Sequence, residues 1–210
     1  MSLTNNTLTN NINNNSSQDP FLCIINNLLT TTECRKLISK CNSLLSEKVD
    51  KSIDPNFSKK MFYSTHFYDD TFCNDLFSRI KEFLPVKAHG FLPKLTLSMY
   101  NDYGYFPLHQ DVQYEHEGMF TQFTLNIFLN GRQEFDGGET DFLKDDKQSL
   151  RYQAVPESGR GALFEEKIWH RGNTVTRGKK YLLRAHILMP MGSGNHNWEK
   201  SIKSGGFEVV

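Results

Sequence analysis

Between Lys94 and Met189 apolar and polar residues alternate, with the period of two that is typical of strands with one buried face. Turn-forming pairs such as Asn130-Gly131 and Ser158-Gly159 separate the alternating runs. The apolar members of three runs are Leu95, Leu97 and Met99; Phe123, Leu125, Ile127 and Leu129; and Tyr181, Leu183 and Ala185. This pattern predicts a mostly β domain of antiparallel strands, of the sandwich or jelly-roll type.

Ahead of this region the pattern is mainly helical. Residues 20–25 form a short apolar run suited to a buried strand. The segment Thr30-Thr31-Thr32-Glu33 resembles a capping box and predicts a helix that continues to about Leu45. Apolar residues at helical spacing predict a second helix over residues 70–84, which Pro85 ends. Two helices are therefore expected to support the β core.

The two ends of the chain differ from its middle. Residues 1–19 are polar and rich in Asn, which predicts a disordered tail because too little apolar surface is available for burial. Residues 191–210 are polar and contain glycines, so a loosely packed C-terminal extension is expected. A chain of 210 residues suits one domain, and its predicted bounds are 20–190 with a core at 95–189.

Charge and composition exclude some classes of partner. The 24 basic residues equal the 24 acidic residues, so no overall field attracts nucleic acid or an anionic membrane. The chain begins without a secretory signal and contains no apolar run long enough for a bilayer. The four cysteines lack zinc-like spacing and are expected to be free thiols. A cytoplasmic location is expected, and the oligomeric state stays open.

The candidate chemistry is a metal site. His109 and Asp111 are two residues apart, so on an extended strand both side chains would face the same side. His170 lies far downstream, where a jelly roll can bring its strand beside the first. Two histidines and one carboxylate on one side of an ion leave positions open, as non-haem Fe(II) oxygenases require. A lone His-x-Asp is common and is usually a hydrogen-bonding surface or core pair, so its context decides.

The context is a series of motifs in a fixed order. Tyr100-Asn-Asp-Tyr-Gly-Tyr-Phe-Pro-Leu-His-Gln-Asp111 comes first, followed by Thr124-Leu-Asn-Ile-Phe-Leu-Asn130 and Gly137-Gly-Glu-Thr140. The series ends with His170-Arg-Gly172, Val175 and Lys180-Tyr-x-x-Arg184. Together they resemble the catalytic core of the Fe(II)/2-oxoglutarate dioxygenases, in particular the prolyl 4-hydroxylase-like branch. The resemblance implies a double-stranded β-helix fold.

The resemblance also implies roles for individual residues. His109, Asp111 and His170 match the catalytic iron ligands, while Lys180 and Tyr100 match the residues that bind the far carboxylate of 2-oxoglutarate. A buried carboxylate needs such cationic and hydroxyl partners. Arg184 shares a strand face with Lys180 and could contact the substrate, help hold 2-oxoglutarate or pair with a carboxylate; substrate binding is the role assigned here. The implied cofactors are Fe(II), 2-oxoglutarate and O2, and a requirement for ascorbate stays open.

The implied reaction hydroxylates an unactivated C–H bond and yields succinate and CO2. A prolyl residue in a protein or peptide is the expected substrate, because the resemblance points there. The alternatives are a dioxygenase for a free amino acid or another small molecule, and a non-enzymatic jelly-roll module that binds metal or 2-oxoglutarate. An AlkB-like nucleic-acid demethylase is disfavoured by the neutral charge, and a zinc hydrolase would give Lys180 and Tyr100 no function.

Overall fold

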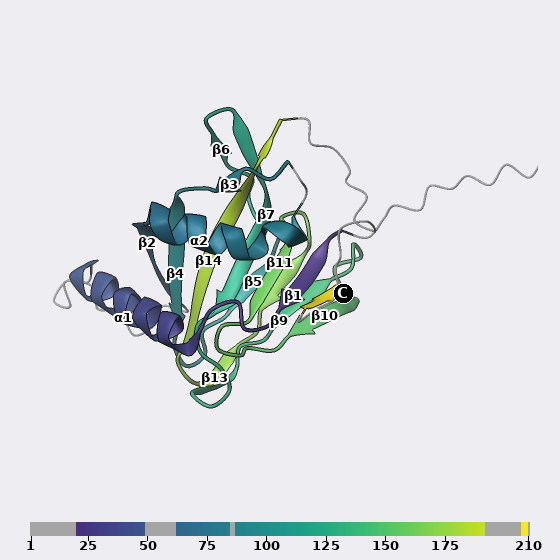
Figure 1. Ribbon diagram of the computed structural model, residues 1–210. Helices are drawn as coiled ribbons and strands as arrows, with labels where there is room; N and C mark the ends of the chain where they lie inside the picture. Colours follow the sequence, from purple (N-terminus) through teal and green to yellow (C-terminus); the bar gives the residue numbers. More distant parts are fainter. Residues whose placement is uncertain (1–19, 49–61, 85–86, 192–206, 210) are drawn as a thin grey trace, which may run out of the picture.

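The computed structural model describes residues 20–48, 62–84, 87–191 and 207–209 (Figure 1). The Asn-rich segment 1–19, for which the sequence predicts disorder, lies outside the described residues. Neither described α-helix combines the length and the apolar character that a bilayer span requires.

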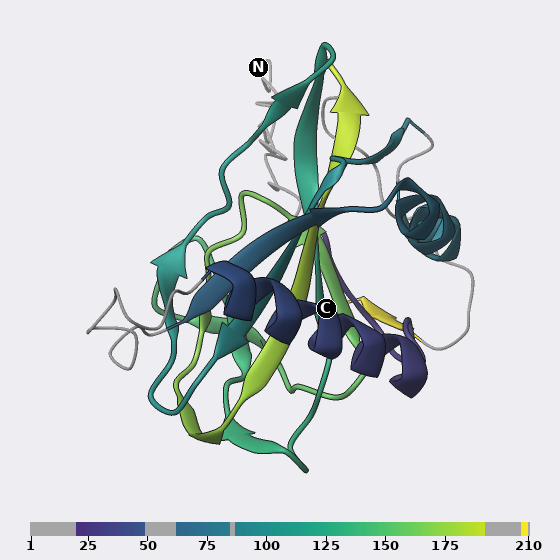
Figure 2. The same cartoon turned by 90° about the vertical axis from the view of Figure 1, so that its left-hand side faces the viewer.

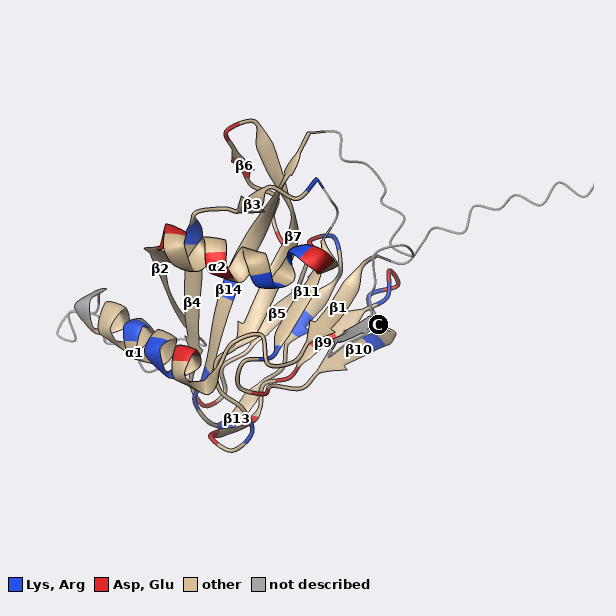
Figure 3. Ribbon diagram, in the orientation of Figure 1, with Lys and Arg blue, Asp and Glu red and all other residues tan. Residues whose placement is uncertain are grey.

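Charged residues of both signs are spread over helices and loops (Figure 3), in keeping with the neutral net charge.

Most described elements are short antiparallel strands. The helices come before the longest strands in the chain. The elements in chain order are β1 (Leu22–Ile25), α1 (Thr31–Lys48), β2 (Tyr63–Tyr68), α2 (Asp70–Ile80), the 3-10 helix η2 (Lys81–Phe83), β3 (Gly90–Phe91), β4 (Lys94–Tyr100), β5 (Phe106–His109), β6 (Glu115–His116), β7 (Met119–Phe128), β8 (Phe135–Gly137), β9 (Thr140–Leu143), β10 (Leu150–Ala154), β11 (Gly161–Glu165), β12 (His170–Gly172), β13 (Val175–Gly178), β14 (Lys180–Pro190) and β15 (Phe207–Val209).

The strands form two principal sheets. The large sheet has the order β15-β1-β11-β7-β14-β4-β2, with β3 paired to β14 and β6 to β7. The small sheet has the order β10-β9-β12-β5, and β13 pairs with β8 separately. This is the predicted double-stranded β-helix. Strand β15 joins the edge of the large sheet by pairing with β1, which the polar composition of the last segment did not predict.

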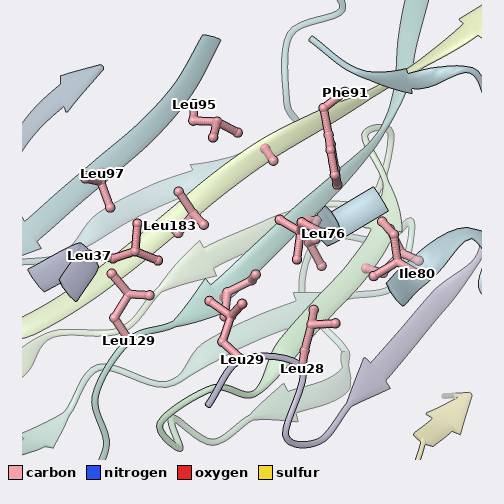
Figure 4. Packing of buried hydrophobic residues seen from close by; sticks show 14 of the residues in the cluster. Leu28, Leu29, Leu37, Leu76, Ile80, Phe91, Leu95, Leu97, Leu129 and Leu183 are labelled. Atoms are coloured by element: carbon pink, nitrogen blue, oxygen red, sulfur yellow. The ribbon is translucent and has the colours of Figure 1, made fainter. Parts of the chain in front are cut away.

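Strict alternation along β4 and β14 separates two cores. The odd-numbered residues of both strands, such as Leu97 and Leu183, face the helices, whereas Tyr100 and Leu182 face the small sheet. Both helices lie against one face of the large sheet, α1 over β2 and β4 and α2 beside β3 (Figures 1 and 2). Leucines from the helices and strands interdigitate there (Figure 4). The second core lies between the sheets and includes Phe128, Phe142 and Phe164.

The predicted capping box is confirmed and also links the two helices. The backbone N–H of Thr30 donates to Glu33 at 2.7 Å, and the N–H of Glu33 donates to the Thr30 hydroxyl at 3.2 Å. Glu33 also accepts from Arg79 of α2 at 2.6 Å. The bond from Arg79 is the main reason that the pKa of Glu33 falls from 4.5 to about 2. The second helix ends earlier than predicted, because Ile80 is followed by the 3-10 turn η2.

We expect Glu33→Gln to lower the free energy of unfolding by about 1 kcal/mol at pH 7, since it weakens the cap and removes the ion pair with Arg79. Because folding lowers the pKa of Glu33 to about 2, its charge stabilises the fold above pH 4.5 and this contribution disappears as the pH falls towards 2. Urea unfolding of both proteins, followed by circular dichroism between pH 7 and pH 3, measures the difference. A difference that stays constant over this range would contradict the assignment.

Candidate functional site

The pairing of β12 with β5 brings the predicted metal ligands together. His170 lies directly opposite His109 in the antiparallel register. Strand β5 ends at His109, so Asp111 lies just beyond it, and its backbone N–H donates to the carbonyl of Glu166 at 3.0 Å. One donor atom from each of His109, Asp111 and His170 lies within 4.8 Å of the others, which is close enough to hold one metal ion.

Backbone carbonyls orient both imidazole rings. Nδ1 of His109 lies 2.9 Å from the carbonyl of Pro107, and Nδ1 of His170 lies 2.9 Å from that of Ile168. A carbonyl only accepts, so each Nδ1 carries the proton and each Nε2 is free to bind a metal. The Nε2 atoms lie 3.4 Å and 3.9 Å from carboxylate oxygens of Asp111. Burial lowers the pKa of His170 to about 4, so this ring is neutral near pH 7.

The carboxylate of Asp111 is also held in place. Its Oδ2 accepts a hydrogen bond of 2.6 Å from the hydroxyl of Thr124 on β7. Burial by itself raises the pKa of Asp111, but the two histidines, Thr124 and Arg184 together lower it well below the usual range. The carboxyl is therefore ionised at any pH at which the protein would work, as a metal ligand must be.

A buried hydrogen-bond chain supports Thr124 from behind. Nδ1 of His186 lies 2.8 Å from Glu166 Oε1 and 3.3 Å from the Thr124 hydroxyl. The hydroxyl of Thr121 donates to the other oxygen of Glu166 at 3.0 Å. Sequence analysis assigned no role to Glu166 or His186, because they are 20 residues apart and match no motif. Together they hold Thr124 so that it donates to Asp111.

The triad opens into a pocket of about 210 Å³ between the two sheets. Its wall combines aromatic, hydroxyl, amide and cationic side chains from both sheets. The lining residues are Phe62, Ser64, His66, Thr96, Ser98, Tyr100, Phe106, His109, Asn126, Thr140, His170, Gly172, Lys180, Leu182 and Arg184. The pocket thus contains both residues proposed for 2-oxoglutarate, together with Arg184. His66 of β2 also lies in this wall.

Lys180 is a buried cation with little internal compensation. Its ammonium donates to the carbonyl of Gly138 at 2.6 Å, and it lies 5.2 Å from the ring centroid of Tyr100, which is opposite it in the register. Burial lowers the pKa of Lys180 to about 8, against the raising effect of nearby Glu139, and burial raises the pKa of Tyr100 to about 12. An ammonium has three donors, so this group can bind an anion in the pocket. The role of the Gly138 carbonyl was not predicted.

The segment after Asp111 is a hairpin and not an irregular loop. Strand β6 pairs with the start of β7, and the turn between them has positive φ at Glu117 (51°) and Gly118 (75°). This is the two-residue turn type that matches strand twist. The hairpin projects from the end of the sheet (Figure 1).

Comparison with known proteins shows what the chain is similar to. Residues 95–187 match the model of the 2OG-Fe(II) oxygenase superfamily. A search of curated protein sequences gives no match. The structure is similar to the 2OG complex of a collagen prolyl hydroxylase from Paramecium bursaria Chlorella virus-1, with a TM-score of 0.59 and 18% identity over 81% of this chain and 97% of that one.

Two further solved structures share the fold. A prolyl-4-hydroxylase from Pseudomonas putida has a TM-score of 0.59 and 14% identity, and covers 83% of this chain and 95% of its own. A Trichoplax adhaerens prolyl hydroxylase, in complex with a hypoxia-inducible factor peptide fragment, has a TM-score of 0.55 and 16% identity over 80% and 83%. The matched segment contains the whole His109, Asp111 and His170 cluster as well as Lys180 and Arg184. Over residues 95–187 the chain is therefore similar to the 2OG-Fe(II) oxygenase superfamily, and the three solved structures share its fold.

Proposed function

We propose that this protein is an Fe(II)- and 2-oxoglutarate-dependent dioxygenase that hydroxylates an unactivated C–H bond of a prolyl residue in a protein or peptide. One oxygen atom of O2 would enter the prolyl C–H bond and the other would enter succinate, while the carboxyl group of 2-oxoglutarate leaves as CO2. The observation that carries the proposal is the meeting of the His109, Asp111 and His170 cluster with buried Lys180 at one pocket. The prolyl hydroxylases among the similar structures support the choice of substrate.

His109, Asp111 and His170 are proposed to hold Fe(II). Two imidazole nitrogens and one carboxylate oxygen suit this ion, and they leave coordination positions for 2-oxoglutarate and O2. Fe(II) with 2-oxoglutarate supplies the oxidising chemistry, whereas the protein supplies position and a dry environment. The Nδ1–H bonds to Pro107 and Ile168 keep both rings in the orientation that binding requires.

Lys180 and Tyr100 are proposed to bind the far carboxylate of 2-oxoglutarate. The Lys180 ammonium has a single acceptor, Gly138, among the described residues, although it is buried. A buried cation of this kind is stabilised by an anion and favours its entry. Tyr100 lies opposite on β4 and lines the same pocket, so its hydroxyl is available as a second donor.

The metal assignment predicts a visible absorption band. We expect anaerobic addition of Fe(II) and 2-oxoglutarate to the wild type to produce this charge-transfer band, which neither component gives alone. His109→Ala should abolish the band because one ligand is lost, whereas His116→Ala, in the exposed hairpin, should retain it. Titration in an anaerobic cuvette measures both. A band of unchanged intensity in His109→Ala would exclude this residue as a ligand.

The Thr124 hydroxyl is expected to tune metal affinity. Thr124→Val keeps the shape of the side chain but removes the bond to Asp111, so Fe(II) binding should weaken by about tenfold. Thr65→Val is the matched control, because the buried Thr65 hydroxyl has no hydrogen-bond partner among the described residues. Fe(II) titrations give the affinity, and thermal unfolding of the metal-free proteins shows whether stability changes. Equal loss of affinity in both variants would argue against the role of Thr124.

The pKa of Lys180 predicts how 2-oxoglutarate binding depends on pH. The free enzyme has a lowered pKa of about 8, so the amine becomes neutral above this pH and the affinity for the anion should fall. We expect Lys180→Met to bind 2-oxoglutarate weakly at every pH, and Lys180→Arg to bind without the decline above pH 8. Calorimetry between pH 6.5 and 9.5 provides the comparison. A wild-type affinity that stays constant over this range would contradict the assignment.

A further inference from the structure

Arg184 and Asn126 form a polar pair on the pocket side of the large sheet. Arg184 of β14 lies directly opposite Asn126 of β7 in the register, and both line the pocket. Nη1 of Arg184 is 3.7 Å from Oδ1 of Asp111, so the guanidinium is next to the proposed metal position. Four residues of strand, or roughly 13 Å, separate Arg184 from Lys180. The two cations therefore serve different parts of the pocket.

Both side chains contain a buried polar atom without a partner. Nε of Arg184 and Oδ1 of Asn126 have no hydrogen-bond partner among the described residues, and Asn126 is only 6% exposed. Unsatisfied buried groups are costly, by about 1–3 kcal/mol each, and native structures contain few of them. The two ends of the Asn126 amide are similar in size, so it can turn either its oxygen or its NH2 group towards a ligand.

The Arg184 guanidinium is not fully used by Asp111. A separation of 3.7 Å is too long for a hydrogen bond, and Thr124 already donates to that carboxylate at 2.6 Å. An Fe(II) ion bound to Asp111 would neutralise most of the negative charge of this carboxylate. Arg184 would then keep free donors in a fork that suits a carboxylate.

The charge balance of the loaded site points to an anionic acceptor. Fe(II), Lys180 and Arg184 bring four positive charges, whereas Asp111 and the dianion 2-oxoglutarate bring three negative ones. Glu139, the acid nearest Lys180, is already paired with Arg132 at 2.5 Å. The pocket lining includes no Asp or Glu. Counted over these groups one positive charge remains, and Arg184 is the cation beside the proposed metal position, whereas the buried Glu166 carboxylate lies behind Thr124 and is paired with His186.

We propose that Arg184 and Asn126 bind a free carboxylate of the acceptor, which rests on the function proposed above. Because Arg184 lies beside a metal ligand, the carboxylate and the oxidised carbon would belong to the same residue. The acceptor is then a prolyl unit with its own carboxylate free, either proline itself or a prolyl residue at the C-terminus of a chain. A prolyl residue inside a chain would leave Arg184 without its anion.

Binding to the anaerobic enzyme loaded with Fe(II) and 2-oxoglutarate tests this proposal without turnover. Calorimetry compares N-acetyl-L-proline with its amide, and L-proline with its amide. N-acetyl-L-proline stands for a prolyl residue at the C-terminus of a chain, and L-proline stands for the free amino acid. We expect at least one acid to bind about tenfold more tightly than its amide, the size of a charge-assisted hydrogen bond. The acid that binds more tightly shows whether the acceptor is free proline or a C-terminal prolyl residue. Equal binding of acid and amide in both pairs would overturn the subsite.

Variants locate the preference. Arg184→Gln should remove the discrimination between acid and amide, and Asn126→Asp, which keeps the shape, should reduce it by placing a competing carboxylate against Arg184. Arg35→Gln removes one charge from the surface of α1, where Arg35 pairs with Glu134, and should leave the preference unchanged. The affinity for 2-oxoglutarate should be the same in Arg184→Gln as in the wild type. A preference that survives Arg184→Gln, or a large loss of 2-oxoglutarate affinity in this variant, would refute the assignment.

A second pair of probes separates this subsite from the prolyl proposal. N-acetylglycine and its amide present the same choice without a ring. If both acids are preferred equally and no prolyl compound is hydroxylated on admission of O2, the carboxylate subsite is supported and the prolyl substrate is wrong. If an internal prolyl peptide is hydroxylated and acids bind no better than amides, the prolyl substrate is supported and the subsite is wrong.

Discussion

The pairing of β12 with β5 is the interaction on which the site depends. It sets His170 opposite His109, and the following backbone bond from Asp111 to the Glu166 carbonyl fixes the third ligand. A slip of one residue in this register would turn His170 to the other face and separate the ligands. Both strands are short, with four and three residues, so their own ladder is weak. Their alignment therefore relies on β9 and on the packed core between the sheets.

The polar groups on the two sides of the His109, Asp111 and His170 cluster differ in how many hydrogen-bond partners they have. Behind the cluster, the chain from Asp111 through Thr124 and His186 to Glu166 is fully hydrogen-bonded. Towards the pocket, Lys180 has one acceptor, and Arg184 keeps a buried donor without a partner. A satisfied network keeps the ligands rigid, because breaking any member would leave a buried polar group unpaired. If anions bind on the open side, as proposed, their binding would also stabilise this part of the fold.

Periodicity predicted the parts of the fold that alternate over many residues. The long strands β4, β7 and β14 and the capped start of α1 follow directly from local sequence. The short strands β8 and β13 were missed, because three or four residues do not establish a period. His109, His170 and Lys180 line one pocket, and Asp111 lies within 4.8 Å of both histidines, so the residues that spacing and the family resemblance singled out do come together. Glu166, His186 and the Gly138 carbonyl were not assigned roles, since their contacts arise only from the pairing of distant strands.

The inner face of β14 shows how one strand can serve several functions independently. Its first four even-numbered residues are Lys180 in the pocket, Leu182 in the core between the sheets, Arg184 beside Asp111 and His186 behind Thr124. Their odd-numbered neighbours pack against the helices, so a change on the inner face leaves that outer core intact. Of the four, Arg184 is the most exposed, and it meets the hydrogen-bonded chain behind the cluster only through Asp111, at 3.7 Å. A change at Arg184 therefore disturbs fewer buried contacts than a change at Lys180 or His186, which are both buried and hydrogen-bonded.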